Sequence, residues 1–232
     1  MTIYAISDMH GNLNGLNPAG CDVVVVAGDF APLSGFGKWH VYEQKKWTQS
    51  KFFEWIEKYP DIQFIITPGN HDMFADPKYQ AAYRDMNFSV QWPSNAKLLL
   101  NSGCEFNGLR FWGTPNVPII NHRWAFESDD ETLRRRFSAI PEKVDVLVSH
   151  GPPRISGQAL DISLEYGVDS PAFGSYELAA AVFDKKPRYM FCGHIHSGQH
   201  GRTAFNGTAI YNVSRVDESY EIAYEPAVVE IS

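Results

Sequence analysis

Five short groups of residues along the chain combine carboxylate, amide and imidazole side chains, the types that bind metal ions through oxygen and nitrogen. The groups are Asp8-Met9-His10, Gly28-Asp29, Gly69-Asn70-His71-Asp72, Ser149-His150-Gly151 and Gly193-His194-Ile195-His196. Five of the eight histidines of the chain lie in them. Polar groups gathered in one place are costly to bury unless they find partners, and metal ions would provide such partners. We therefore expect a metal centre built from oxygen and imidazole ligands.

Each group follows a segment with the character of a buried strand. Val23–Ala27 begins with four consecutive β-branched residues, which is typical of a strand buried on both faces of a parallel-type sheet. The other segments of this kind are Thr2–Ser7, Gln63–Thr67, Val144–Ser149 and Tyr189–Cys192. Because open α/β sheets place their ligands at the carboxyl ends of the strands, we expect the five groups to meet at one edge.

The remaining elements are expected to cover and complete the sheets. Helices are predicted from apolar spacing and end signals over Trp39–Tyr59, Asp76–Met86, Trp124–Phe137 and Ser175–Phe183. Further strands are predicted over Lys97–Leu100, Cys104–Phe106, Leu109–Gly113, Thr208–Val213 and Val228–Ile231. Residues Arg154 to Gly174 have no clear periodicity, and a loop of that length is usually functional or disordered. No linker or repeat separates these elements, so one domain is expected over residues 1–232.

The overall composition argues against polyanionic partners. The chain carries a formal net charge of -7, whereas proteins that bind nucleic-acid polymers or membrane surfaces present basic patches. No apolar stretch is long enough to span a bilayer, and no secretory signal is visible. The three cysteines Cys21, Cys104 and Cys192 lie far apart in the sequence, which suits a reducing compartment. We expect a cytoplasmic protein, and its oligomeric state is left open.

Taken together, the five groups resemble the motifs of the calcineurin-like metallophosphoesterase superfamily. Its blocks D-x-H, G-D, G-N-H-D, H-G and G-H-x-H all occur here in that order, from residue 8 to residue 196. The resemblance implies an α/β fold in which two packed mixed β-sheets are flanked by helices, a four-layer α/β/β/α sandwich. It also implies a site for two divalent or trivalent metal ions at the strand ends.

The same resemblance implies a division of roles among the residues of the blocks. His71 would be the catalytic histidine beside the metals, and Asp72 would orient it. The alternative for Asp72 is an aspartate that caps a turn. The implied metal ligands are Asp8, His10 and His196 for the first ion, Asn70, His150 and His194 for the second, and Asp29 as the bridge between them.

These ligand types predict the chemistry of a two-metal hydrolase. Oxygen and imidazole ligands without thiolates suit Mn, Fe, Zn or Ni, and Mn is the metal expected to serve best in vitro. Two ions about 3.5 to 4 Å apart can lower the pKa of a shared water molecule, so that it binds as hydroxide, and can also bind the phosphate oxygens. In-line attack of that hydroxide on phosphorus needs no protein nucleophile. The leaving oxygen then needs a proton, which His71 would supply.

A narrower resemblance concerns the second half of the chain. Its segments are similar to the small metallophosphoesterase-domain-containing group, which in turn is similar to class III cyclic nucleotide phosphodiesterases. The substrate implied is a small phosphodiester, with cyclic nucleotides as candidates. The alternatives are a phosphomonoesterase, a phosphoprotein phosphatase, a dinucleoside polyphosphate hydrolase, or a non-catalytic scaffold of the same fold. The segments that carry this resemblance are Leu109–Pro115, Ile140-Pro141, Asp145–Pro153 and Gly193–Ser197.

Four residues outside the blocks are candidate substrate contacts. Asn12 follows the first block and could touch a phosphate oxygen, although a turn at this position is the alternative. Asn116, His122 and Arg123 lie on a loop that could reach the mouth of the site, and arginine is a natural partner of phosphate. The alternative for these three residues is a solvated surface loop.

Overall fold

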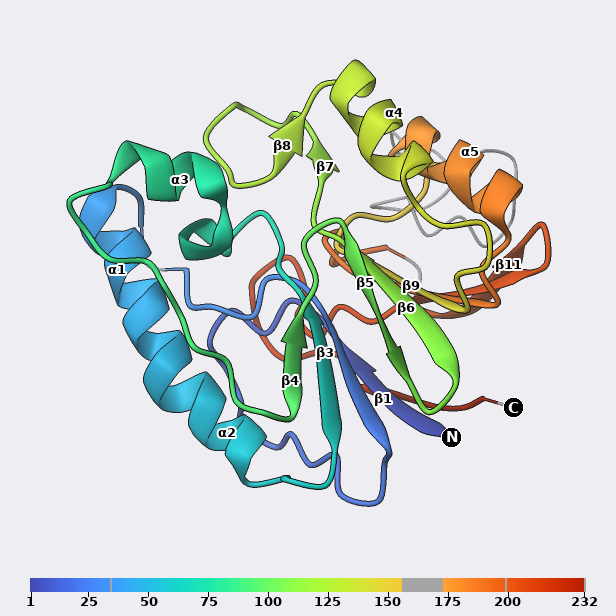
Figure 1. Ribbon diagram of the computed structural model, residues 1–232, viewed down its shortest axis with the longest axis horizontal. Coiled ribbons are helices and arrows are strands. Elements are labelled where there is room, and N and C mark those ends of the chain that lie inside the picture. The colour runs from blue at the N-terminus through green and yellow to red at the C-terminus, as the bar shows by residue number, and fades with distance from the viewer. Residues whose placement is uncertain (34, 156–172, 199, 232) are drawn as a thin grey trace.

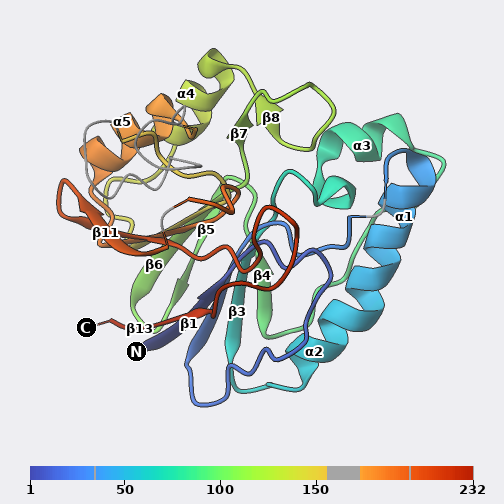
Figure 2. The ribbon, with the colours of Figure 1, turned by 180° about the vertical axis from the view of Figure 1, so that it is seen from behind.

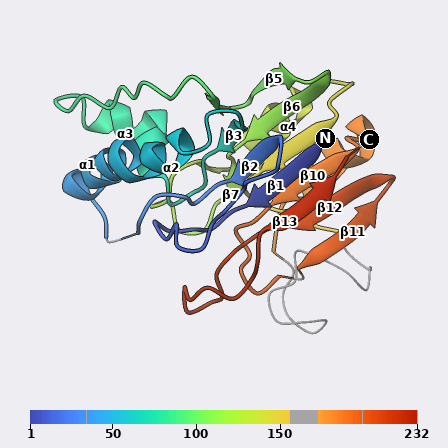
Figure 3. The same cartoon turned by 90° about the horizontal axis from the view of Figure 1, so that it is seen from below.

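The fold is described by a computed structural model over residues 1–33, 35–155, 173–198 and 200–231. Most of the predicted long loop, residues 156–172, lies outside the described residues. In the described part, two β-sheets pack face to face, and helices cover the outer face of each sheet (Figures 1 and 3). The predicted arrangement of two mixed sheets flanked by helices is therefore confirmed.

The first sheet is built mainly from the N-terminal part of the chain. Within the described residues its strand order is β13-β1-β2-β3-β4. The edge strand β13 (Ala227–Glu230) runs antiparallel to β1 and brings the two ends of the chain together (Figure 2). The other strands are parallel to one another: β1 (Thr2–Ile6), β2 (Val23–Ala27), β3 (Gln63–Thr67) and β4 (Ala96–Leu98).

The second sheet has the order β11-β12-β10-β9-β6-β5 in the described part of the chain. Its edge strands β5 (Ser102–Phe106) and β11 (Gly201–Phe205) are antiparallel to their neighbours. Strand β11 was not predicted, because it lies at an edge and has no continuous apolar face. The inner strands are parallel: β6 (Leu109–Thr114), β9 (Val146–Ser149), β10 (Tyr189–Cys192) and β12 (Thr208–Asn212).

The layers pack through side chains that alternate along each buried strand. In β2, Val25 faces the core between the two sheets, whereas Val24 faces the helices that cover the first sheet. In β10, Phe191 faces the core between the sheets and Met190 faces the helices of the second sheet. A fully buried side chain of this size contributes roughly 1.5–3 kcal/mol. Apolar layers on both faces therefore explain why an unbroken run of valines forms a strand.

Four helices cover the outer faces of the sheets (Figure 1), as far as the chain is described. The first sheet is covered by α1 (Lys38–Trp47) and α2 (Phe53–Glu57), which are separated by a π-helical turn over Thr48–Phe52. The second sheet is covered by α4 (Asp130–Ser138) and α5 (Tyr176–Lys185). No helix of the described residues is long and apolar enough to cross a membrane.

Two predicted helices are shorter in the structure. Helix α3 (Pro77–Ala82) begins as predicted, where the side chain of Asp76 accepts the N–H of Lys78, but it ends before Met86. Helix α4 begins at Asp130 rather than at Trp124, because Asp129 caps it by accepting the N–H of Thr132. The residues before this cap include β8 (Glu127–Ser128), which pairs with β7 (Val117–Pro118) outside the two main sheets.

Candidate metal centre

The five sequence groups meet at one edge of the two packed sheets, where the parallel strands end. Backbone hydrogen bonds join these strand ends, from Asp8 N to Gly28 O (3.0 Å) and from Gly193 N to His150 O (2.9 Å). The five groups therefore lie together at this edge, as the sequence predicted. The residues that follow the strand ends are Asp8, Asp29 and Asn70 in the first sheet, and His150 and His194 in the second.

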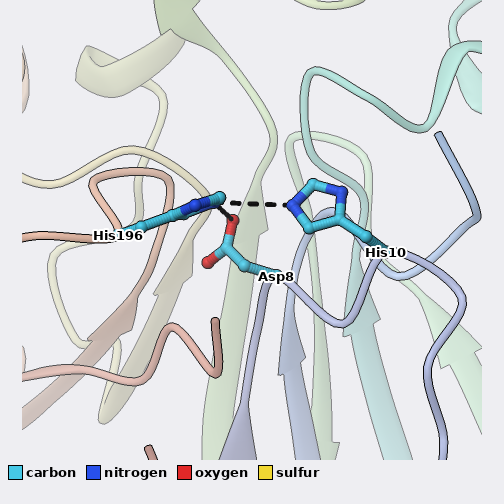
Figure 4. Close-up of side chains that lie close together, drawn as sticks. All are labelled: Asp8, His10 and His196. Atoms are coloured by element: carbon cyan, nitrogen blue, oxygen red, sulfur yellow. Dashed lines mark hydrogen bonds and ion pairs between the residues drawn. The ribbon is translucent and has the colours of Figure 1, made fainter. Parts of the chain in front are cut away.

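One donor group consists of Asp8, His10 and His196 (Figure 4). His196 Nε2 lies 3.4 Å from Asp8 Oδ1 and 3.4 Å from His10 Nε2. The second oxygen of Asp8, Oδ2, accepts hydrogen bonds from Ser214 Oγ (2.7 Å) and from the backbone N–H of His194 (3.0 Å). The protein thus holds one oxygen of the carboxylate and leaves the other facing the imidazole of His196.

A second donor group consists of Asp29, His150 and His194, with Asn70 beside it. His150 Nε2 lies 3.3 Å from Asp29 Oδ2 and 2.8 Å from Asn70 Oδ1. A third group contains His10, Asp29 and His71, and it therefore shares one residue with each of the other two groups. Within each group the donor atoms lie within 4.8 Å of one another. The three groups therefore form one continuous cluster of side chains that could hold metal.

Backbone carbonyls fix the orientation of two of these imidazoles. His150 Nδ1 lies 2.9 Å from Ala27 O, and His196 Nδ1 lies 3.1 Å from Asp217 O. Because a carbonyl oxygen only accepts hydrogen bonds, each Nδ1 carries a proton and each Nε2 is directed at the cluster. Histidines that bind metals usually have such a partner on their other nitrogen.

The two carboxylates and their histidine partners shift one another's pKa. Burial alone would lower the pKa of His150, but Asp29 outweighs it and raises the pKa to about 9. The pKa of His196 is likewise lowered by burial but raised overall to about 9 by Asp8. Burial would raise the pKa of Asp8 and Asp29, but the histidines hold both below the usual range. In the absence of metal, protons on His150 and His196 therefore balance the carboxylates.

Two further histidines of the cluster, His10 and His194, are neutral. Burial lowers the pKa of His10 to about 4, and burial together with His150 lowers the pKa of His194 to about 3. Neutral imidazole is the form that binds a metal ion. Among the described residues, the buried Nδ1 atoms of His10 and His71 also have no hydrogen-bond partner. Both observations fit a centre that is completed by metal ions.

Several of the same residues also have a strained backbone conformation. The φ angles are 52° for Asp8, 43° for His10, 51° for Asp29 and 73° for His194. A residue held in such a sparsely populated region costs about 1–3 kcal/mol, and these residues cluster at functional sites. The donor set of carboxylate, amide and imidazole suits ions such as Mn, Fe, Zn and Ni. The residues present therefore fit a site that could hold metal ions.

Comparison with known protein families shows which family the chain belongs to. Residues 1–198 match the family model described as calcineurin-like phosphoesterase. The chain belongs to the calcineurin-like phosphoesterase family. The resemblance predicted from the five sequence groups is thereby confirmed, and membership of the family supports a metal-dependent hydrolase of phosphoesters.

Relatives of this calcineurin-like phosphoesterase match nearly its whole length. Metallophosphoesterase domain-containing protein 1 of Homo sapiens is 27% identical over 245 residues, which cover 97% of this chain and 69% of that protein. The UPF0046 protein C25E10.12 of Caenorhabditis elegans is 27% identical over 237 residues, which cover 97% of this chain and 79% of that protein. The phosphopantetheinyl hydrolase from Mycobacterium tuberculosis has a TM-score of 0.56 at 16% identity, covering 94% of this chain and 90% of that structure. This last likeness shows the fold alone.

The loop that follows β3 places His71 beside the donor groups of this phosphoesterase. Its Nε2 atom lies 3.9 Å from Asp29 Oδ2, and its backbone N–H donates to Asp29 Oδ1 over 2.7 Å. The carboxylate of Asp72 instead accepts the backbone N–H groups of Ala31 (2.9 Å) and Gly69 (2.7 Å). Among the described contacts, none joins Asp72 to the ring of His71, so Asp72 closes the turn. A catalytic contribution of Asp72 stays a prediction.

An open pocket of about 340 Å³ leads to the donor groups. The indole of Trp124 stacks on the ring of His71 with the ring centroids 4.2 Å apart, and the ring of Tyr220 lies 4.8 Å from that of His10. Tyr220 lies in the loop after β12. Because β12 is parallel to β10, its carboxyl end lies at the same edge of the sheet, and this topology could have predicted that the loop reaches the site. The wall residues that the sequence did not single out include Ile120, Trp124, Phe173, Glu218 and Tyr220.

Two of the four candidate substrate residues hold local structure. Asn12 accepts the N–H of Asn14 through its side-chain oxygen over 3.1 Å, which is the alternative turn role. Asn116 is buried, and its side-chain amide donates to Ser128 Oγ over 3.0 Å. Neither residue is among the described residues that line the pocket. Contact of Asn12 or Asn116 with the substrate stays a prediction.

The other two candidates are exposed on the loop before α4. The backbone N–H of His122 donates to Glu127 Oε1 over 3.2 Å, and Arg123 lies next to it in the chain. The described lining of the pocket includes neither residue but includes Trp124. The loop therefore reaches the site, as predicted, but through Trp124. Phosphate binding by Arg123 stays a prediction.

The pKa shifts predict opposite pH effects on metal-free stability and on metal binding. The folded-state pKa values of His150 and His196, about 9, exceed the usual histidine value of 6.5. Their stabilisation is therefore complete below about pH 6.5 and is lost as the pH rises toward 9. Metal binding must displace the same protons, so metal affinity should rise over this interval.

Thermal unfolding in EDTA and in Zn²⁺ at pH 6.5, 7.5 and 8.5 checks this prediction. A loss of about 2 kcal/mol in EDTA between the extreme pH values would lower the melting temperature by roughly 4–8 °C. The stabilisation by Zn²⁺ should increase over the same range. Higher metal-free stability at pH 8.5 than at pH 6.5 would contradict the assigned charges.

Gly193 is predicted to be essential for the position of Asp8. A Cβ atom at Gly193 would overlap Ser7 Oγ and Asp8 Oδ2. We expect Gly193→Ala to lower the free energy of unfolding by about 1–3 kcal/mol through overpacking. We also expect weaker metal binding by at least about 10-fold, because the carboxylate loses its outer contacts. Chemical denaturation and calorimetric titration with Mn²⁺ measure the two effects.

A matched control is Gly20→Ala. Gly20 has a φ of +87° and no atom within 4 Å of an added Cβ, so this change introduces backbone strain without a clash. It should cost about 1–2 kcal/mol of stability and leave metal affinity unchanged. Equal metal affinity in the two variants would show that Gly193 does not position Asp8.

Proposed function

We propose that this protein is a dinuclear metal-dependent phosphodiesterase, with cyclic nucleotides among the candidate substrates. The observation that carries the proposal is the continuous cluster, in which Asp29 belongs both to the group with His150 and to the group with His10. One carboxylate shared between two donor groups is the arrangement that a pair of ions needs. Two metal ions bound there would acidify a water molecule and neutralise the phosphate oxygens.

The residues of the site would have separate roles as metal ligands and as a proton donor. Asn70 offers a neutral oxygen, so it adds a ligand without adding negative charge. His71 faces the pocket through its ring and would donate a proton to the leaving oxygen. The proposed ligands are Asp8, His10 and His196 for one ion, Asn70, His150 and His194 for the other, and Asp29 for both.

The wall of the pocket supports a diester rather than a monoester. Among its described lining residues there is no Lys or Arg, whereas Glu218 is present. A phosphomonoester carries a charge of about -1.5 to -2 at neutral pH, and it would meet little positive charge from this wall. A phosphodiester carries one negative charge and two organic groups, which suit the side chains of Trp124, Ile120 and Phe173.

The test compares bis(p-nitrophenyl) phosphate with p-nitrophenyl phosphate in Mn²⁺, with Zn²⁺, Ni²⁺ and Fe²⁺ as further metals. We expect kcat/KM to be at least about 10-fold higher for the diester, a difference of about 1.4 kcal/mol in transition-state binding. A preference for the monoester would replace the proposal with a phosphomonoesterase. A panel of cyclic nucleotides and dinucleoside polyphosphates then narrows the substrate class.

A catalytically inactive scaffold of the same fold is the competing function of a different class. Metal analysis after Mn²⁺ loading separates the two, because the proposal requires two equivalents per chain. Fewer than two equivalents together with no hydrolysis of either ester would favour the scaffold. The observation that favours the enzyme is that one cluster contains all five motif histidines together with Asp8 and Asp29.

A further inference from the structure

The imidazole of His71 has no hydrogen-bonded anchor among the described residues. Its Nδ1 atom is buried without a partner, and its Nε2 atom lies 3.9 Å from Asp29 Oδ2, beyond hydrogen-bond distance. Asp72, the neighbour in sequence, uses both carboxylate oxygens for the N–H groups of Ala31 and Gly69. Since rotation about the terminal torsion of a histidine is broad, another contact must set the direction of this ring.

The side chain that lies on this ring is Trp124. The indole and the imidazole are nearly parallel, with an interplanar angle of 11° and a centroid separation of 4.2 Å. On the remaining sides, the ring of His71 meets His10 edge to face at 5.0 Å and Tyr220 at 6.4 Å. The stack with Trp124 therefore provides the only described contact across a whole face of the imidazole.

The loop that carries Trp124 is itself held in place. Glu127 accepts the backbone N–H of Trp124 through Oε2 over 2.9 Å. The next residue, Ala125, donates its N–H over 2.9 Å to the carbonyl oxygen of Asn70, which immediately precedes His71. Phe36 packs against the indole at a centroid distance of 4.8 Å. The indole is therefore fixed relative to the loop that carries the imidazole before any substrate binds.

We propose that Trp124 is the positioning residue of His71. By covering one face of the imidazole, it fixes the plane of the ring so that a ring nitrogen is directed into the pocket, where the leaving group would lie. This inference rests on the proposed role of His71 as proton donor to that group. It assigns to Trp124 the task that the family resemblance implied for Asp72.

The kinetic test uses Trp124→Leu and Trp124→Phe with two ester series, one with a nitrophenolate leaving group and one with an alkoxide leaving group. An alkoxide needs the proton far more than a nitrophenolate does. We expect Trp124→Leu to lower kcat about 10–100-fold for the alkyl esters and less than about 3-fold for the nitrophenyl esters. Trp124→Phe should recover most of the loss, because it can stack. In a His71→Ala background, Trp124→Leu should cause no further loss.

The control is Ile120→Ala, a change in the same loop and the same pocket wall that removes no described contact to the ring of His71. It should alter KM without changing the ratio of the two series. Equal losses for both leaving groups in Trp124→Leu, or a full additional loss in the His71→Ala background, would overturn the proposal.

Proton NMR tests the stack without any measurement of activity. The ring signals of His71, assigned by their absence in His71→Ala, should be shifted upfield by the indole in the metal-free and the Zn²⁺-loaded protein. They should move downfield in Trp124→Leu, and unchanged positions would overturn the proposal. The kinetic comparison is made on whichever ester class is hydrolysed, so a monoester preference refutes only the proposed diesterase. Absence of all hydrolysis would refute the proposed function, while the NMR signals would still decide the position of the ring.

Discussion

Asp29→Asn should reduce the metal content from two equivalents to one or fewer and lower turnover by at least about 100-fold. Loss of a residue that only supports a metal ligand typically lowers activity by about 10- to 100-fold, so the loss of a ligand should exceed that range. The carboxylate of Asp29 belongs to two donor groups, so its loss affects both halves of the cluster. Asparagine is the informative replacement because it tolerates the φ of 51° at this position. It also keeps an oxygen that accepts the N–H of His71. The negative charge is removed, and one acceptor oxygen is replaced by an amide donor.

Metal analysis after loading and dialysis measures this effect, together with turnover of the preferred ester. The matched control is Asp72→Asn, which removes a second buried carboxylate from a neighbouring turn. An amide there would present N–H to the N–H of Ala31 or Gly69, so it should cost about 1–3 kcal/mol of stability. It should nevertheless retain two metal equivalents. Full metal content in Asp29→Asn would rule out its bridging role.

His71→Ala should keep two metal equivalents and lose about 100- to 10,000-fold in kcat, the range typical of a general acid. The backbone of His71 donates to Asp29 and accepts from Gln44, and both contacts survive truncation of the side chain. The donor cluster should therefore persist. The loss should be largest for esters with alkoxide leaving groups, because these depend most on protonation.

The measurement is kcat for the two leaving-group series beside metal content. His122→Ala is the control, because His122 is exposed and is not among the described residues that line the pocket. That control should leave both quantities unchanged. Equal loss of metal in His71→Ala and Asp29→Asn would contradict the division between proton donor and ligand.

Local sequence was sufficient to predict the buried strands and the residues at their ends. The valine run of β2 can bury both faces only inside a layered sheet, and β2 has the predicted bounds. Polar residues directly after such strands must emerge at the sheet edge, which is why Asp8, Asp29 and His150 are found together. The ordered set of five groups was specific enough to identify the family before any coordinates were considered.

The sequence was less informative about the elements with weak patterns. In the edge strand β11 the buried position holds the polar Thr203 and an exposed position holds the apolar Ala204, so its sequence shows no apolar alternation. The helix predicted from Trp124 begins only at Asp130. The backbone N–H groups of Ile120, Asn121 and Trp124 instead donate to the carboxylate of Glu127, which holds this segment as a loop. Such contacts depend on the path of a whole loop, which no short window contains.

The sequence by itself determined the buried strands, the family and the set of residues that could bind metal, because these follow from local periodicity and from where polar residues interrupt it. Only the tertiary structure decided what surrounds His71. The family resemblance implied that Asp72 orients this ring, but in the fold its carboxylate accepts the backbone N–H of Ala31, a residue 41 positions away in the chain. One face of the His71 ring is covered by Trp124. Trp124 lies on a loop that hydrogen bonds to Glu127 and Asn70 hold in place. Ring stacking of this kind depends on the meeting of distant loops, and that meeting is set by long-range hydrogen bonds rather than by neighbours in sequence.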